Sequence, residues 1–217
     1  ASFWKIFLFI SNYNLNMIRL ISAKFLIILL YVNSLIAEKI PDLFNFIDSN
    51  GQQFLTVIKE EGSNYEDYPE EFKNKLKDIW EPMVDIRAVS RLILSKDIYS
   101  KASNEQISTF EERTKKVLLD KYVTTLIEFE NYNIETIEDI KVTKRRFEVS
   151  MKFYSASDSF ITKFTVYKDS NGDYKIVNII IDGINLGLLF RNSFQEIYNQ
   201  YNEDLDKAIE AWRPTAF

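Results

Sequence analysis

The chain has 217 residues, of which 46% are apolar and 15% aromatic, and this length suffices for one domain with a substantial core. It contains no cysteine and no histidine, which excludes disulfides, thiol nucleophiles, imidazole bases and most zinc or haem sites. Its formal net charge of −5 disfavours a nucleic-acid partner and permanent residence on anionic lipid headgroups.

The first 37 residues contain the pattern of a secretory signal peptide. Residues 17–37 combine two basic residues, an apolar core at 25–32 and the small residue Ala37 at the end. That core is too short to span a bilayer, which needs about 20 apolar residues. Cleavage after Ser34 and retention as a membrane anchor are the alternatives. We interpret residues 1–16 as an upstream segment and residues 38–217 as one exported domain.

Helical periodicity dominates the first half of this domain. Apolar residues recur at three- and four-residue spacing from Pro41 onward, with Gly51 as a point where the helix could bend. Pro69 fits the first turn of a second helix, which Pro82 should end. A third amphipathic segment covers residues 83–94. The longest helix then begins at a capping box, in which Ser103 and Gln106 satisfy free backbone groups.

Four strand candidates follow, at 134–140, 144–154, 160–168 and 174–181. The second and third alternate apolar with polar residues, which predicts one buried face. The fourth is apolar on both parities, which is typical of a strand covered on both faces. The Asn-Gly pair in the turn at 169–172 predicts an antiparallel hairpin between the third and fourth strands.

The pattern changes sharply after the fourth strand. Asp182-Gly183 breaks the apolar run with residues that tolerate positive φ, and Leu188 and Phe194 then belong to an amphipathic helix. Residues 202–212 predict a short closing helix. The whole order predicts an α+β fold, in which N-terminal helices wrap a curved, mainly antiparallel four-stranded sheet.

An ordered set of motifs runs through the domain. Its last part consists of Tyr174-Lys175-Ile176-Val177, Asp182-Gly183-Ile184-Asn185-Leu186, Arg191 and Phe194. Its first part consists of Met83-Val84-Asp85, Leu92-Ile93-Leu94, Ala102-Ser103 with Glu105-Gln106, Phe110 and Tyr122. Over residues 41–212 this set resembles the MlaC family, periplasmic phospholipid-transport proteins also called toluene tolerance proteins. Three positions depart from the family pattern, because Ser95 replaces a usual glycine, Tyr99 a usual tryptophan and Asn185 a usual serine.

The resemblance implies a nuclear transport factor 2-like or cystatin-like sheet around an apolar cavity. It implies a soluble, monomeric periplasmic carrier, not an enzyme, that shuttles phospholipid between the outer and inner membranes and maintains outer-membrane lipid asymmetry. The implied partners are an outer-membrane lipoprotein complex and an inner-membrane ABC transporter with its substrate-binding ring. Phospholipid would be the cargo, and no cofactor, metal or nucleic acid is implied.

On this resemblance, we expect apolar side chains from the sheet and the covering helices to form the lipid-binding wall. The expected wall residues are Val84, Val89, Leu92, Leu118, Tyr122, Leu126, Val149, Met151, Phe153, Phe164, Val166, Ile176, Ile179, Ile181, Leu188 and Phe194. Taken singly, each is more often a core residue than a ligand contact. Arg191 either meets a headgroup phosphate or forms a salt bridge to an acid such as Asp182. Either parity of the fourth strand could face the cavity.

The energetics of carriage constrain such a site. Burying two acyl chains of about 16 carbons each is favourable by roughly 25 kcal/mol relative to water. The lipid, however, leaves a membrane and not water. The carrier therefore needs only to match the bilayer as an apolar solvent. A cavity of about 800 Å³ would be required, and a dry void of that size is costly. We therefore expect the empty protein to collapse partly or to copurify with lipid.

Three other functions compete with phospholipid carriage. The cargo could be a hopanoid or another sterol-like lipid, or the chain could be an envelope adaptor without a lipid-sized cavity. An enzyme would need an acid/base group such as Asp182 with Tyr122 or Tyr174 as its partner. An acid with a raised pKa deep in the pocket would favour that enzyme.

Overall fold

The computed structural model describes residues 39–143 and 145–213, and for residues 39–40, 121–124 and 139 only the backbone is considered. The predicted signal segment and the residues before it lie outside this part of the chain. The chain divides into two units, residues 1–43 and 44–217, and the elements that bear on function lie in the second.

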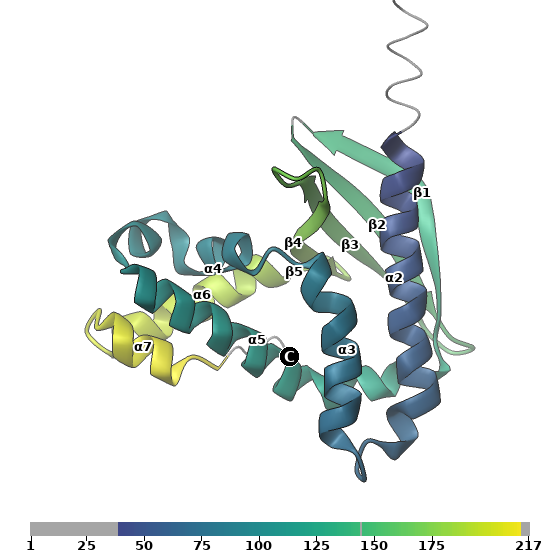
Figure 1. The fold of residues 1–217 in the computed structure, drawn as a ribbon, viewed down its shortest axis with the longest axis horizontal. Coiled ribbons are helices and arrows are strands. Elements are labelled where there is room, and N and C mark those ends of the chain that lie inside the picture. The colour runs from purple at the N-terminus through teal and green to yellow at the C-terminus, as the bar shows by residue number, and fades with distance from the viewer. Residues whose placement is uncertain (1–38, 144, 214–217) are drawn as a thin grey trace, which may run out of the picture. The chain divides into compact units, whose positions relative to one another are not determined.

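Helices, then strands, then helices follow one another in the predicted order (Figure 1). The helices are α2 (Lys39–Glu61), α3 (Pro69–Met83), α4 (Ile86–Lys101), α5 (Asn104–Ile127), α6 (Leu186–Gln200) and α7 (Leu205–Ala211), with 3-10 turns η1 (Gly62–Asn64) and η2 (Glu128–Asn131). The strands are β1 (Asn133–Thr143), β2 (Arg146–Tyr154), β3 (Ser159–Lys168), β4 (Tyr174–Ile181) and β5 (Ile184–Asn185). The predicted α+β class is confirmed.

The strands form one open antiparallel sheet in chain order, β1-β2-β3-β4-β5. The four predicted strands are present, and β5 is a further strand of two residues. The turn between β3 and β4 has positive φ at Gly172, and the turn between β4 and β5 has φ values of 48° at Asp182 and 83° at Gly183. Both breaks therefore use the backbone freedom that their residue types predict.

Local signals place most helix ends where the sequence predicts them. Pro69 occupies the first turn of α3, and both hydrogen bonds of the capping box between Ser103 and Gln106 are present at the start of α5. The prediction that Pro82 ends its helix is wrong by a residue, since α3 continues to Met83. A proline in the last turn of a helix removes one backbone hydrogen bond, and the end of the helix tolerates this loss.

Gly51 has a packing role instead of marking a bend, because α2 runs through it as one helix. A Cβ atom at Gly51 would lie 2.6 Å from Met151 Cε and 3.2 Å from Ile134 Cδ1. The missing side chain thus lets α2 approach β1 and β2 closely. Thr136 of β1 also donates a hydrogen bond to Asp48 of α2, at 2.8 Å.

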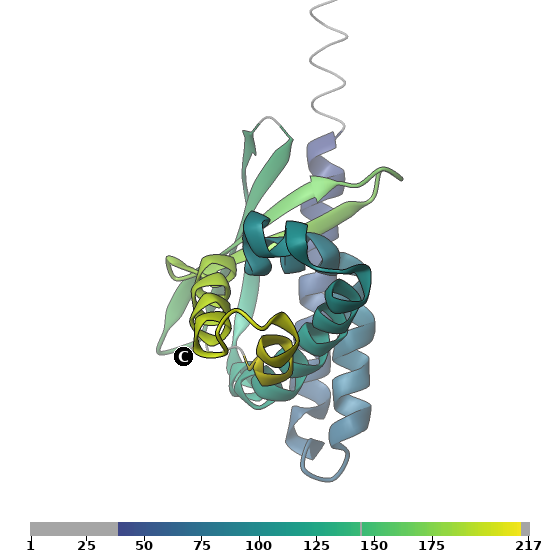
Figure 2. The ribbon, with the colours of Figure 1, turned by 90° about the vertical axis from the view of Figure 1, so that its left-hand side faces the viewer.

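The helices build two apolar cores. In the first, α4, α5, α6 and α7 pack against one another (Figure 2), around the fully buried side chains of Leu94, Phe110, Phe194 and Trp212. The Trp212 indole N–H donates to Thr114 Oγ1 at 3.1 Å, so the one polar atom of this ring is satisfied. The second core joins α2 and α3 through Ile58, Phe72 and Leu76, with Leu119, Leu126 and Ile127 against it.

The junction between α3 and α4 is fixed to β4 by a set of contacts that we call the latch. The Asp85 amide donates to the Ile176 carbonyl at 3.0 Å, and Lys175 Nζ donates to the Pro82 carbonyl at 2.7 Å. The Tyr167 hydroxyl donates a short hydrogen bond to the Asp85 carboxylate. Two motif segments about 90 residues apart, one with Asp85 and one with Lys175, therefore meet here.

The latch changes the start of the third predicted helix. Val84 is extended and forms a parallel bridge with Ile176, so α4 begins only at Ile86. Asp85 caps α4 by accepting a hydrogen bond from the Ala88 amide at 2.8 Å. One carboxylate thus serves both the helix end and the sheet.

Helix α4 contains a strained residue. Ser95 has φ 64° and ψ 166°, a region that is essentially restricted to glycine, and α4 is kinked there. At this position the family pattern has a usual glycine. A serine in this conformation costs about 1–3 kcal/mol.

Replacing Ser95 by glycine should relieve this strain. Allowing for the greater entropy of glycine in the unfolded chain, we expect Ser95→Gly to raise the free energy of unfolding by about 1 kcal/mol, or about 3 °C in Tm. The matched control is Ser108→Gly on the exposed face of α5, which should lose about 0.5 kcal/mol. Thermal and urea unfolding measure both, and an equal loss for the two variants would contradict the strain at Ser95.

Replacing Tyr167 by phenylalanine tests the latch. The hydrogen bond to Asp85, together with burial, raises the pKa of Tyr167 from 10.0 to about 12. Because the folded pKa lies above the unfolded one, this stabilisation is complete below pH 10 and is lost as the pH rises toward 12. We expect Tyr167→Phe to cost about 1 kcal/mol at neutral pH, with the deficit closing above pH 10.

Urea unfolding at neutral pH and at about pH 11 measures this deficit. Tyr68→Phe is the control, because the Tyr68 side chain is 63% exposed and should show no deficit at neutral pH. A Tyr167→Phe deficit that is unchanged at the higher pH would rule out the assigned role of the hydroxyl.

Candidate functional site

The inner face of the sheet, which packs against α2, carries rows of apolar side chains. Residues that pair across antiparallel strands point to the same side of the sheet. Phe153 pairs with Phe160, Met151 with Thr162, Val149 with Phe164 and Phe147 with Val166. The alternation predicted for β2 and β3 is therefore present, and the polar residues Glu148, Lys152 and Lys163 lie on the outer face.

A bulge settles the parity of β4. The register between β3 and β4 shifts at Thr165 and Val166, so Val166 pairs with Ile176, whereas Phe164 pairs with Ile179 and Thr162 with Ile181. Ile176 therefore shares the inner face with Ile179 and Ile181, although its number has the other parity. The bulge thus brings apolar residues of both parities to the inner face.

The expected wall residues differ in their exposure. Five of them are buried in packed protein, with relative exposures from 0% to 5%: Val149, Met151, Val166, Ile176 and Phe194. Nine are half-buried: Val84, Val89, Leu92, Leu118, Leu126, Phe153, Phe164, Ile179 and Ile181. Leu188 is 50% exposed, and the side chain of Tyr122 lies outside the described residues. Only the accessible side chains are free to contact a ligand in this conformation.

The structure brings some of these residues together and separates others. The sheet residues share the inner face, and Val84 joins them at Ile176. Val89 and Leu118 pack instead against the core that contains Phe194, and Leu126 packs against the core of α2 and α3. The expected set therefore spans one sheet face and two helical cores.

We call five half-buried apolar residues of the inner face the apolar wall: Phe153, Phe160, Phe164, Ile179 and Ile181. Phe147 is also half-buried on this face, but its ring packs against Tyr174. Helix α2 covers Met151 and Ile134, whereas Phe164 of β3 and Ile179 of β4 remain partly accessible. The apolar wall thus offers hydrocarbon contact without a charged residue among its members.

An aromatic cluster extends one end of this wall, and of its members only Phe153 belonged to the expected set. Phe153 and Phe160 stack at 5.0 Å between ring centroids, and Phe129 of η2 lies 6.1 Å from Phe153 and 5.6 Å from Phe160. Tyr132 lies 5.2 Å from Phe129, and its hydroxyl donates to Asp158. Phe160 could have been found from sequence, because it shares the parity of Phe164. The turn that carries Phe129 has no such periodicity.

Arg191 is engaged inside the protein. Its Nε donates to the Leu92 carbonyl at 2.6 Å, which links α6 to α4 just before the kink at Ser95. A kink interrupts the regular hydrogen bonds of a helix, so carbonyls near it need other partners. The Arg191 guanidinium therefore contacts the Leu92 carbonyl and not Asp182, which is exposed in the β4–β5 turn. Because Asp182 is exposed, it is not the deep carboxylate that the enzyme hypothesis needs.

Helix α6 approaches this region through another close contact. A Cβ atom at Gly187 would lie 2.4 Å from Leu92 Cδ2 and 2.5 Å from Asn178 Oδ1, and the Gly187 amide donates to that same oxygen at 3.0 Å. Asn185 caps α6 by accepting from the Leu188 amide. The asparagine that replaces a usual serine therefore keeps the capping function.

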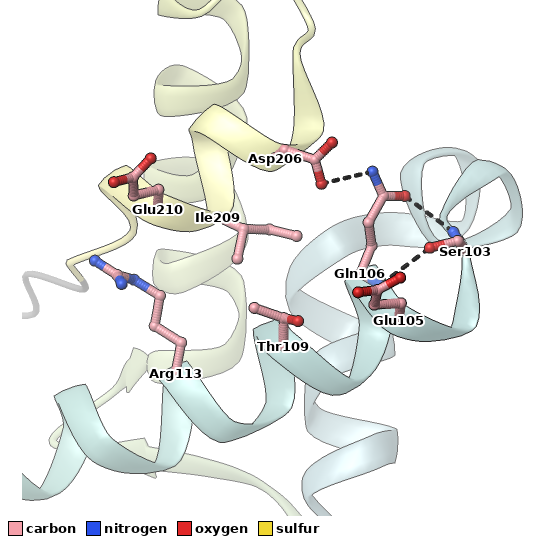
Figure 3. A pocket seen from close by; sticks show the side chains of 8 residues that line it. All are labelled: Ser103, Glu105, Gln106, Thr109, Arg113, Asp206, Ile209 and Glu210. Carbon is pink, nitrogen blue, oxygen red and sulfur yellow. Dashed lines mark hydrogen bonds between the residues drawn. The ribbon is translucent and has the colours of Figure 1, made fainter.

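Two hollows of the described residues lie away from the expected wall. One has a volume of about 560 Å³ between α5 and α7 and is lined mainly by polar side chains, among them Glu105, Arg113 and Glu210 (Figure 3). Gln106 bridges its mouth by donating to Asp206 at 2.9 Å. The other, of about 330 Å³, lies between α2 and α3. Neither is lined by a residue expected to contact lipid.

The described residues contain no group of three or more acidic side chains placed to hold a metal ion. Within the same ranges, no helix combines the length and the apolarity that crossing a membrane requires.

Comparison with known proteins identifies the family. The family model described as MlaC protein matches residues 48–214. The chain belongs to the MlaC family. A relative, the toluene tolerance protein ttg2D of Pseudomonas putida, is 28% identical over 188 residues, which cover 86% of this chain and 87% of the relative.

A solved structure shares the MlaC fold of this chain. It is the phospholipid-binding protein from Ralstonia solanacearum, determined in complex with a phospholipid. The TM-score is 0.67 at 17% sequence identity, and the match covers 76% of this chain and 91% of that one. At this identity the match establishes the shared α+β architecture.

Replacing Arg191 by methionine distinguishes a structural role from a headgroup contact. Methionine keeps an apolar stem but cannot donate to the Leu92 carbonyl, so we expect the free energy of unfolding to fall by about 1–2 kcal/mol. Arg145→Met, in the exposed turn before β2, should change it by less than about 0.5 kcal/mol. Unchanged stability in Arg191→Met would leave a ligand contact as the role of this side chain.

Proposed function

We propose that the chain is a soluble periplasmic carrier that holds the acyl chains of a phospholipid against its apolar wall. The observation that carries this proposal is the set of half-buried apolar side chains on the inner face, Phe153, Phe160, Phe164, Ile179 and Ile181. Membership of the MlaC family and the shared fold of a protein determined with bound phospholipid support it.

The physics of lipid transfer fits such a wall. An acyl chain moves from one apolar environment to another, so dispersion contacts with phenylalanine and isoleucine side chains suffice, and a strong headgroup anchor is unnecessary. Room for the chains would come from separating the wall from the elements beside it. The half-buried state of Phe164 and Ile179 supports this, because these side chains already have area that protein atoms do not cover.

The proposed location and partners follow from the same reasoning. The signal-like segment at 17–37 and the family membership support export to the periplasm. There the carrier would receive lipid from an outer-membrane lipoprotein complex and deliver it to an inner-membrane ABC transporter with its substrate-binding ring, or move it in the opposite direction. Such shuttling would maintain the lipid asymmetry of the outer membrane.

Mass spectrometry of organic extracts from the purified protein tests the proposal. We expect near-stoichiometric phospholipid, together with a strong loss in Ile179→Asn. An unpaired amide against an acyl chain costs about 1–3 kcal/mol, which corresponds to binding weaker by about 5-fold to 150-fold. The matched control is Ile180→Asn, because Ile180 is also half-buried in β4 but pairs with Lys163 on the outer face.

The outcomes separate the competing functions. Recovery of a hopanoid or another sterol-like lipid would keep the carrier role and change its cargo. Absence of any lipid, from both the extract and the protein after incubation with phosphatidylethanolamine vesicles, would favour an envelope adaptor. Equal losses in Ile179→Asn and Ile180→Asn would show that the apolar wall is not the binding surface.

A further inference from the structure

Two arginines and a tyrosine gather on the outside of α4. The Arg87 Nε donates to the Tyr99 hydroxyl at 3.3 Å, and the Arg91 guanidinium carbon lies 4.9 Å from the centroid of the Tyr99 ring. Both arginines are exposed, and Tyr99 is half-buried. We call these three side chains the arginine cluster.

The strained residue of α4 brings the cluster together. In an unbroken helix, positions 87 and 99 would be separated by about 18 Å along the axis, far beyond a direct hydrogen bond. The glycine-like conformation of Ser95 turns the chain so that Tyr99 reaches back to Arg87. Strained conformations of this kind concentrate at functional sites, which makes the cluster that the kink assembles a candidate functional site.

Two acids, Glu111 and Asp85, attract Arg87 electrostatically, but neither is close enough to form an ion pair with it. Among the residues that the structure describes, neither guanidinium forms an ion pair with a carboxylate. The nearby Asp85 carboxylate is engaged by the Tyr167 hydroxyl and the Ala88 amide. Hydrogen bonding from Arg87, followed by that from Arg91, lowers the pKa of Tyr99, which is consistent with a positive local potential. This contrasts with the acidic balance of the whole chain.

We propose that Arg87, Arg91 and Tyr99 form a surface site for a phosphate group. One guanidinium is enough to pair both oxygens of a carboxylate, whereas two guanidinium groups offer donors for the three or four oxygens of a phosphate. A bound dianion would also offset the repulsion between two arginines that a neutral phenol holds together. No residue of the apolar wall takes part, so this site does not depend on the proposed lipid carriage.

Isothermal titration of the full chain with inorganic phosphate tests the site. We expect saturable binding that weakens at least about tenfold in the double variant Arg87→Gln, Arg91→Gln. The matched control is Lys96→Gln, Lys101→Gln, which removes the same charge from exposed positions of the same helix and should bind like the unmutated chain. Equal weakening in both double variants, or no binding by the unmutated chain, would overturn the proposal.

A second measurement on the unmutated chain guards against misfolding of the variants. Phenylglyoxal modifies accessible arginines, and mass spectrometry of the digested protein locates the modification. Bound phosphate should protect Arg87 and Arg91 and leave the exposed Arg145 and Arg146 reactive. Equal modification of all four with and without phosphate would contradict the site even if the double variant failed to fold.

The source of the phosphate group can be decided by sedimentation with vesicles. The unmutated chain and both double variants would be compared on phosphatidylcholine vesicles with and without phosphatidylglycerol. Sedimentation that requires phosphatidylglycerol and is lost only in the arginine variant assigns a lipid headgroup as the ligand. Phosphate titration that depends on the arginines, without such sedimentation, assigns free phosphate.

Discussion

The backbone hydrogen bond between the Asp85 amide and the Ile176 carbonyl is the constraint on which the rest of the structure depends. It attaches the start of α4 to the edge of β4 and leaves the Asp85 side chain free to cap the helix and accept from Tyr167. Everything that α4 carries, including Leu92 and the arginine cluster, is positioned from this point. A backbone bond suits this purpose because it does not depend on side-chain rotamers.

The kink of α4 has consequences on two sides. On one side the Leu92 carbonyl accepts from Arg191, which joins α6 to α4 and sets the place where Gly187 meets Leu92. On the other side Tyr99 reaches Arg87. A single strained residue thus couples the position of α6 to the shape of an exposed surface. The strain at Ser95 is tolerated because the hydrogen bond from Arg191 of α6 and the contact within α4 between Arg87 and Tyr99 hold the kink in place.

The inner face of the sheet divides according to what covers it. Under α2, the close approach at Gly51 leaves Met151 without exposure, and such residues serve stability. Elsewhere on this face, Phe164 and Ile179 keep accessible area, which is the property that an acyl chain would use. In a carrier the core and the binding surface are therefore made of the same residue types, and coverage alone separates them.

The sequence by itself determined the local elements and the family, because those depend on periodicity, capping and turn chemistry over short stretches. The alternation of β2, the capping box at Ser103 and the Asp182-Gly183 break all reappear in the structure. Only the tertiary structure decided which apolar residues remain accessible and what Arg191 binds. Periodicity shows that a face avoids water, but it does not show which distant segment covers that face. The bulge in β4 and the bond to Leu92 depend on partners that no local pattern specifies.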